Sequence, residues 1–242
     1  MKLIKLDAID STNDFLKSLS SQDEQENFTV VTAENQTKGK GQMGAKWSSE
    51  TGKNLIMSVL VKDFLFDNEQ VFNLSIVVSL AVLDALKSLN IPDLCIKWPN
   101  DIMSYNKKIG GILIENTLKS DGRIVSVVGI GINVNQTNYE ELPRGSSLAV
   151  ISGKTFDKEN LAILITEKIE EKTKLWITSS SLFWIDYFNS LFKKGVPMPF
   201  KNLEDKNFMG IIQGVSPIGK LQVLLEDDSV SEFEIKEIQM LY

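Results

Sequence analysis

Hydrophobic and polar positions along the chain follow two periods, which together predict a fold that combines strands with helices. Short apolar runs rich in β-branched residues predict strands over residues 28–33, 55–61, 94–98, 109–115 and 124–134. Apolar residues at helical spacing predict helices over residues 68–89, 157–176 and 182–193. A shorter helix is predicted to begin near Ser11, because a hydroxyl residue followed by an apolar run is typical of a capped N-terminus.

The pattern changes at Gly195. Beyond it, short alternating runs at residues 208–215, 221–225 and 230–235 are separated by Pro, Gly and Asp, which is typical of a small antiparallel barrel. We therefore expect an α+β protein of two domains. Residues 1–194 would form a mixed or antiparallel β-sheet packed against helices, and residues 195–242 a small C-terminal β-barrel.

Composition narrows the class of protein. The chain has 242 residues, 43% hydrophobic and 24% charged, as in ordinary soluble globular proteins that need no disulfide or metal to fold. Its net charge of -6 disfavours binding to nucleic acid, which requires a basic face. We find no N-terminal signal segment and expect no apolar run long enough to span a bilayer, so a cytoplasmic location is predicted. Cys95, within an apolar run, is expected to pack as a small hydrophobic residue.

The chain contains no histidine. Catalysis by a Ser-His-Asp or Cys-His group, and zinc held by histidine, are therefore excluded. Any chemistry must use lysines, carboxylates, backbone amides and a weakly held hard cation such as magnesium.

Two neighbouring segments are rich in candidate chemistry. Residues 97–101 read Lys-Trp-Pro-Asn-Asp, and residues 108–115 read Lys-Ile-Gly-Gly-Ile-Leu-Ile-Glu. Lysines at strand ends beside small residues suit an anionic, phosphate-bearing ligand. Taken alone, the same pattern also fits a surface hairpin with solvated lysines.

A glycine-rich loop precedes the second predicted strand. Residues 39–44 read Gly-Lys-Gly-Gln-Met-Gly and formally match G-x-G-x-x-G, but a dinucleotide site requires a helix after the loop, and here a strand is predicted. The sequence also lacks a P-loop motif. The alternatives are a surface loop without a role and a loop that orders over a ligand, donating backbone N–H groups while Trp47 stacks on an aromatic base.

Taken together and in this order, the motifs resemble those of the biotin protein ligases. The matching positions are Ser11-Thr12-Asn13, Gln36, the glycine loop with Trp47, residues 97–101, Lys108 with the glycines after it, and Gly-Ile-Gly-Ile-Asn at residues 129–133. The match is strong over residues 1 to about 195 and looser beyond. It implies the class II aminoacyl-tRNA-synthetase-like fold of biotin and lipoate ligases, with a Src-homology-3-like C-terminal barrel.

The resemblance implies a two-step acyl transfer that needs ATP and Mg²⁺. Biotin and ATP would form biotinyl-5′-AMP, and a lysine of a biotin carboxyl carrier protein would then accept the biotin. Lysines and Mg²⁺ can stabilise the negative charge of the first transition state without histidine.

The resemblance also implies roles for individual residues. Lys108, Lys97 and Asp101 would be the catalytic group, with Lys108 touching the reacting oxygens. Asp101 would either bind magnesium or help to deprotonate the incoming lysine. The implied biotin contacts are Ser11, Thr12, Asn13, Gln36, Gly39, Lys40, Gly41, Gln42, Lys108, Gly111 and Gly129. The implied nucleotide contacts are Lys40, Gln42, Trp47, Lys97 and Asn133.

Two departures from the family pattern matter. The family loop usually reads Gly-Arg-Gly-Arg-x-Gly, whereas Lys40 and Gln42 replace the arginines here, and Gln42 carries no charge. Some relatives also begin with a DNA-binding helix-turn-helix, whereas this sequence starts on the catalytic region, so we expect no repressor role. A homodimer formed through sheet edges is plausible for the fold. The alternatives are a lipoate protein ligase and a non-catalytic protein that binds biotin or a nucleotide.

Overall fold

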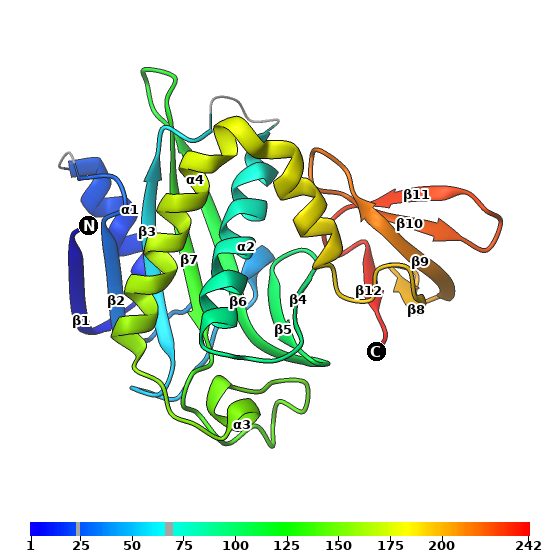
Figure 1. The fold of residues 1–242 in the computed structure, drawn as a ribbon, viewed down its shortest axis with the longest axis horizontal. Helices are drawn as coiled ribbons and strands as arrows, with labels where there is room; N and C mark the ends of the chain where they lie inside the picture. Colours follow the sequence, from blue (N-terminus) through cyan, green and yellow to red (C-terminus); the bar gives the residue numbers. More distant parts are fainter. Residues whose placement is uncertain (23–24, 66–69) are drawn as a thin grey trace.

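A computed structural model describes residues 1–22, 25–65 and 70–242, and its main element is a seven-stranded mixed sheet (Figure 1). In spatial order the strands are β1 (Leu3–Ile9), β2 (Val30–Gln36), β3 (Leu55–Lys62), β7 (Ile124–Ile132), β6 (Lys107–Leu118), β5 (Asp101–Ser104) and β4 (Leu94–Lys97). The pair β1–β2 is parallel and the other neighbours are antiparallel. The expected α+β sheet is confirmed.

Helices cover both faces of this sheet. Helices α2 (Val71–Ser88) and α4 (Lys158–Asn189) pack against each other over one face, in front of the sheet in Figure 1. Helix α1 (Thr12–Gln22) places Leu16 on the other face, against Val31, Leu60 and Val127. Strand residues alternate between the two apolar clusters, as the period of two in a β-strand requires.

The helix predictions need two corrections. The helices expected over residues 157–176 and 182–193 are the two segments of α4, which is kinked at Ser179 (φ -138°), and the second segment ends at Asn189 rather than at residue 193. The short helix α3 (Leu148–Ser152) was not predicted. Its N-terminus is capped by the Ser147 side chain, which accepts from the backbone N–H of Val150. The predicted start of α2 at residue 68 lies outside the described residues.

Helix α2 also corrects the expectation that no apolar run could cross a bilayer. Over its 18 residues it is long and apolar enough to do so, but 67% of it is buried inside the protein. Packing between the sheet and α4 explains its composition, because a helix that is apolar all round is buried in the core of a globular protein as well as in a membrane.

A second, five-stranded antiparallel sheet follows Gly195. Its spatial order is β11 (Val230–Phe233), β10 (Leu221–Leu225), β9 (Asn207–Val215), β8 (Pro197–Asn202) and β12 (Ile238–Met240). The three predicted runs correspond to β9, β10 and β11, whereas β8 and β12 were not predicted. The Trp98 indole N–H donates to the Gly219 carbonyl at 2.9 Å and so joins the first sheet to the second.

Cys95 is partly buried against the main core, as predicted for a small hydrophobic residue. Burial raises the pKa of its thiol to about 11. Below that pH the thiol is neutral and weakly nucleophilic.

Candidate active site

A cavity of about 540 Å³ lies between the large sheet, the glycine loop and the second sheet. Twelve of the fifteen candidate residues line it: Ser11, Thr12, Asn13, Gln36, Lys40, Gly41, Gln42, Trp47, Lys97, Lys108, Gly111 and Gly129. The other three, Gly39, Asp101 and Asn133, do not line it. Motifs separated by as many as 118 positions, from Ser11 to Gly129, thus meet at one place.

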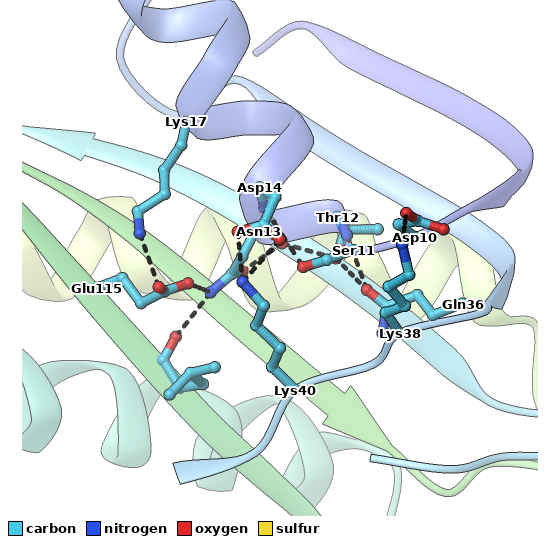
Figure 2. Close-up of polar contacts among 12 residues, drawn as sticks. Asp10, Ser11, Thr12, Asn13, Asp14, Lys17, Gln36, Lys38, Lys40 and Glu115 are labelled. Carbon is cyan, nitrogen blue, oxygen red and sulfur yellow. Dashed lines mark hydrogen bonds and ion pairs between the residues drawn. The ribbon is translucent and has the colours of Figure 1, made fainter. Parts of the chain in front are cut away.

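A buried polar network occupies the wall formed by the start of α1 (Figure 2). Gln36 Oε1 accepts from the backbone N–H of Thr12 at 2.7 Å and lies 3.0 Å from the Thr12 hydroxyl. Ser58 Oγ in β3 lies 2.8 Å from Thr12 Oγ1 and 2.6 Å from Asn13 Oδ1. Ser11 Oγ accepts from the backbone N–H of Asp14 at 3.3 Å, which confirms the predicted cap. Buried hydroxyls and amides bonded in this way hold one arrangement.

Both the nitrogen and the oxygen of the Asn13 side-chain amide form hydrogen bonds within the protein. Nδ2 donates to Glu115 Oε2 at 2.7 Å, and Glu115 Oε1 lies 2.7 Å from Lys17 Nζ (Figure 2). A Cβ atom built on Gly129 would lie 2.5 Å from Asn13 Oδ1. The glycine at position 129 therefore provides space for Asn13.

Lys40 of the glycine loop is turned toward α1. Its ammonium group lies 2.6 Å from the Asp14 carboxylate, and this hydrogen bond raises the pKa of Lys40 (Figure 2). Both side chains are about half exposed, so the pair contributes little to stability. The loop contains one three-residue turn, η1 (Gln42–Gly44), and then leads to strand β3, as expected.

Three charged groups converge at the other end of the cavity. The pairing of β4 with β5 places Lys97 opposite Asp101, and a register shift after Ile102 places Lys108 opposite Met103. Asp101 Oδ1 lies 2.5 Å from Lys108 Nζ, and its Oδ2 lies 3.4 Å from Lys97 Nζ. The Asp101 side chain is only 15% exposed. A largely buried carboxylate therefore holds both lysines beside the cavity.

Trp47 lies across the paired residues Gly111 of β6 and Gly131 of β7. A Cβ atom on Gly131 would come within 2.5 Å of the indole, whereas on Gly111 it would lie 3.7 Å away, in ordinary contact. Within the described part of the chain, the buried Trp47 Nε1 and Gln42 Oε1 have no hydrogen-bond partner. Both belong to residues that line the cavity, so a ligand could satisfy them.

The remaining two candidates support neighbouring segments. Asn133 donates from Nδ2 to the Ser146 carbonyl at 2.9 Å and fixes the turn that leads into α3. A Cβ atom on Gly39 would lie 2.4 Å from the Trp47 carbonyl oxygen, so glycine permits the close return of the loop there.

Further residues in or beside the cavity were not foreseen in the sequence. Arg144 lines the cavity with its guanidinium carbon 4.7 Å from the centre of the Tyr242 ring, and Lys97 Nζ lies 5.4 Å from the same ring. Lys236 donates to the Met43 carbonyl at 2.6 Å, which links the second sheet to the glycine loop. Ser58 and Glu115 complete the network around Asn13. Arg144 and Lys236 lie in turns outside the motifs, and only the positions of Ser58 and Glu115 in motif-bearing or neighbouring strands could have pointed to them.

The site offers few ligands for a metal ion. Among residues 1–22, 25–65 and 70–242, no three His, Cys, Asp or Glu side chains are grouped closely enough to hold one. Asp101 is the carboxylate between the two lysines. Magnesium commonly binds through one or two carboxylates together with substrate phosphates, so this donor set fits an ion that enters with its substrate.

Comparison with known proteins identifies the class to which this fold and cavity belong. The model of the biotin/lipoate A/B protein ligase family matches residues 6–135, and the chain belongs to this family. It is 30% identical over 228 residues to the bifunctional ligase/repressor BirA of Salmonella typhimurium, covering 93% of this chain and 69% of that protein.

A second relative and a solved structure support the same family. The chain is 27% identical over 195 residues to the biotin–[acetyl-CoA-carboxylase] ligase of Mycobacterium tuberculosis, covering 79% of this chain and 71% of that protein. Its structure is similar to that of the biotin protein ligase from Aquifex aeolicus in complex with biotin and ATP. The TM-score is 0.79 at 30% identity, covering 99% of this chain and 98% of the other.

Proposed function

We propose that the protein is an ATP-dependent biotin protein ligase. It forms biotinyl-5′-AMP from biotin and ATP, and then transfers the biotin to a lysine of a biotin carboxyl carrier protein. The observation that carries this proposal is the single cavity in which the polar network at α1 faces the Lys97–Asp101–Lys108 group. Relatives named as biotin ligases support the same activity.

In the first step, an oxygen of the biotin carboxylate attacks the α-phosphorus of ATP. The bond from that phosphorus to the bridging oxygen breaks, and pyrophosphate leaves. In the second step, the ε-amine of the carrier lysine attacks the acyl carbon, AMP leaves, and the amine loses a proton. The first step converts a poor electrophile into a reactive mixed anhydride.

The polar network at α1 would recognise the ureido ring of biotin. Thr12 and Gln36 present a hydroxyl and an amide in fixed orientations, and Ser11 lines the cavity beside them. The backbone of the glycine loop would close over biotin and the phosphates.

The two lysines would stabilise the negative charge that develops on the phosphate. Lys108 Nζ lies 3.6 Å from the Cβ position of Gly111, so the lack of a side chain at Gly111 leaves room for a ligand beside the ammonium group. Asp101 would keep both ammonium groups in place when the cavity is empty. Magnesium that enters with ATP would neutralise part of the triphosphate charge, with Asp101 as the candidate protein ligand.

Trp47 would cover the adenine. Its indole already lies against Gly111 and Gly131, and its buried N–H has no hydrogen-bond partner among the described residues. Asn133 would act near the phosphates through the turn that it fixes.

The wider context follows from the same proposal. Residues 1–194 would be the catalytic domain and residues 195–242 a Src-homology-3-like barrel. The enzyme would work in the cytoplasm on a carrier protein rather than on nucleic acid, since its net charge of -6 repels phosphate backbones. A homodimer through sheet edges stays a prediction.

Exchange of labelled pyrophosphate into ATP tests the proposal, because exchange requires reversible adenylate formation. We expect exchange that depends on both biotin and Mg²⁺. Exchange stimulated by lipoate and not by biotin would identify a lipoate ligase instead, and no exchange with either acid would indicate a protein that only binds its ligand.

A further inference from the structure

Glu115 does not line the cavity, yet it is bonded to a residue that does. Its carboxylate accepts from Asn13 Nδ2 at 2.7 Å and pairs with Lys17 at 2.7 Å (Figure 2). The side chain is 23% exposed, and it belongs to β6 behind the N-terminus of α1. This position suggests an effect on the ligand that is transmitted through Asn13.

The partners of Asn13 fix the orientation of its side-chain amide. A carboxylate paired with a lysine accepts hydrogen bonds and cannot donate them, so the Asn13 atom that faces Glu115 must be the NH₂ group. The Leu113 carbonyl, 3.4 Å from the same nitrogen, is a second acceptor on that side. The amide oxygen of Asn13 therefore faces Ser58, 2.6 Å away.

This orientation determines where the hydroxyl groups of Ser58 and Thr12 send their hydrogens. An amide oxygen only accepts, so Ser58 must donate its single hydrogen to Asn13. Ser58 then has no hydrogen left for Thr12, although their oxygens are 2.8 Å apart. The Thr12 hydrogen goes either to Ser58 or to Gln36 Oε1, 3.0 Å away. In both cases Thr12 presents only oxygen lone pairs to the cavity.

The side chain of Gln36 has the complementary orientation. Its Oε1 accepts from the backbone N–H of Thr12, so its Nε2 must point elsewhere. That nitrogen has no acceptor among the described residues and remains a donor. The wall thus offers an acceptor at Thr12 beside a donor at Gln36. The ureido ring of biotin carries N–H donors beside a C=O acceptor, which is the matching pattern.

We propose that Glu115 is a positioning residue that sets the direction of this hydrogen-bond chain, so that Thr12 accepts an N–H of the biotin ureido ring; this rests on the proposed function. A reversed Asn13 would donate to Ser58, and Ser58 would then donate to Thr12. One lone pair of Thr12 would be used up inside the protein. The carboxylate of Glu115 prevents this reversal, because it would face the oxygen of a reversed amide.

The variant Glu115→Gln tests the proposal. A glutamine can turn its NH₂ group toward Asn13 and so allows the reversed chain. We expect the Kd for biotin, measured by calorimetry, to rise about tenfold, as for the loss of one hydrogen bond of roughly 1.4 kcal/mol. The Kd for ATP should not change, because the nucleotide does not contact this wall. The control Lys17→Met removes the ion pair and keeps the carboxylate, so its biotin Kd should remain within about twofold of wild type.

A double variant provides the rescue. Asn13→Asp combined with Glu115→Gln exchanges the amide and the carboxylate, and a carboxylate at position 13 again forces Ser58 to donate away from Thr12. We expect most of the biotin affinity to return in this variant. If Glu115→Gln alone folds poorly, it is measured in the Ser58→Ala background. There the hydrogen-bond chain from Asn13 to Thr12 is already interrupted, so Glu115→Gln should cause no further loss of biotin affinity.

Provided that the wild-type protein binds biotin, three results would overturn the role of Glu115. They are an unchanged biotin Kd in Glu115→Gln, equal weakening of biotin and ATP, and no recovery in the exchanged pair. Absence of biotin binding by the wild-type protein would instead contradict the proposed function itself.

Discussion

At the scale of residues, Asp101 determines how the two lysines of the site are held. It lies between their ammonium groups, at 2.5 Å from Lys108 and 3.4 Å from Lys97. The shorter contact and the position beside Gly111 indicate that Lys108 is closer to the reacting atoms, whereas Lys97 is shared with the Tyr242 ring. The two cations therefore differ in surroundings, and we expect them to differ in function.

We predict that Lys108→Ala slows adenylate formation by about 10²–10³, the usual effect of removing a group that meets charge developing in the transition state. Lys97→Ala should mainly raise the KM for ATP, because it removes binding that is equal in ground and transition states. Single-turnover rates and ATP titrations separate these effects. Identical kinetic defects in both variants would refute the division of roles.

Gln42 leads to a second prediction at this scale. Its buried side-chain oxygen has no partner in the described part of the chain, and the family usually has arginine at this position. An arginine–phosphate contact contributes roughly 1.5–3 kcal/mol, against about 1 kcal/mol for a neutral hydrogen bond. A difference of ~1.4 kcal/mol corresponds to a tenfold change in the affinity for biotinyl-adenylate. The wild-type enzyme should therefore lose biotinyl-adenylate more readily than Gln42→Arg.

The leaked anhydride would acylate lysines of bystander proteins. Gln42→Arg should lower biotinylation of albumin, detected with streptavidin, and largely keep carrier labelling. Unchanged albumin labelling would mean that Lys40, Lys46 or another nearby cation, such as Arg144 on the cavity wall, already supplies the charge.

At the scale of elements, strands β6 and β7 present a glycine surface on which the glycine loop rests. Gly111 and Gly131 are paired, but only Gly131 lies closer to the Trp47 indole than a methyl group permits. The matched substitutions Gly131→Ala and Gly111→Ala therefore distinguish loss of the contact between Trp47 and Gly131 from the general effect of an added methyl group.

We predict that Gly131→Ala displaces Trp47 toward solvent and costs about 1–3 kcal/mol of folding free energy, as overpacking usually does. The tryptophan emission of the ligand-free protein should shift to longer wavelength. Gly111→Ala, whose new methyl would meet its neighbours at 3.6–3.7 Å, should leave the emission unchanged. Equal spectra for the two variants would show that Trp47 does not rest on Gly131.

The elements also show what could be predicted from sequence. Strands β3, β7 and β10 were found because their β-branched or alternating residues report burial directly. Strands β1, β5, β8 and β12 were missed, since β1 is an edge strand without a fully buried residue and the others have only three to six residues. Their extended form depends on hydrogen bonds to strands distant in the chain. The same holds within the site, where Ser58 and Glu115 become important only after folding brings Asn13 between them.

At the scale of the whole molecule, the second sheet completes the cavity rather than standing apart from it. Phe200, Leu221 and Ile238 contribute to its lining, and contacts from Lys236 to Met43 and from Trp98 to Gly219 join the sheet to both motif-bearing segments. A shared cavity of about 540 Å³ is large enough for a small acid and part of a nucleotide to meet. Both steps of the proposed reaction would therefore take place in this one cavity.

That claim is tested most directly by isolating the intermediate on the enzyme. The protein is incubated with radiolabelled biotin and MgATP, passed rapidly through a desalting column, and then mixed with a biotin carboxyl carrier domain without free biotin or ATP. We predict that label elutes with the protein as biotinyl-5′-AMP, in an amount close to that of the protein, and passes to one carrier lysine. Label that is absent from the protein fraction, or that stays bound and never reaches the carrier, would contradict the account.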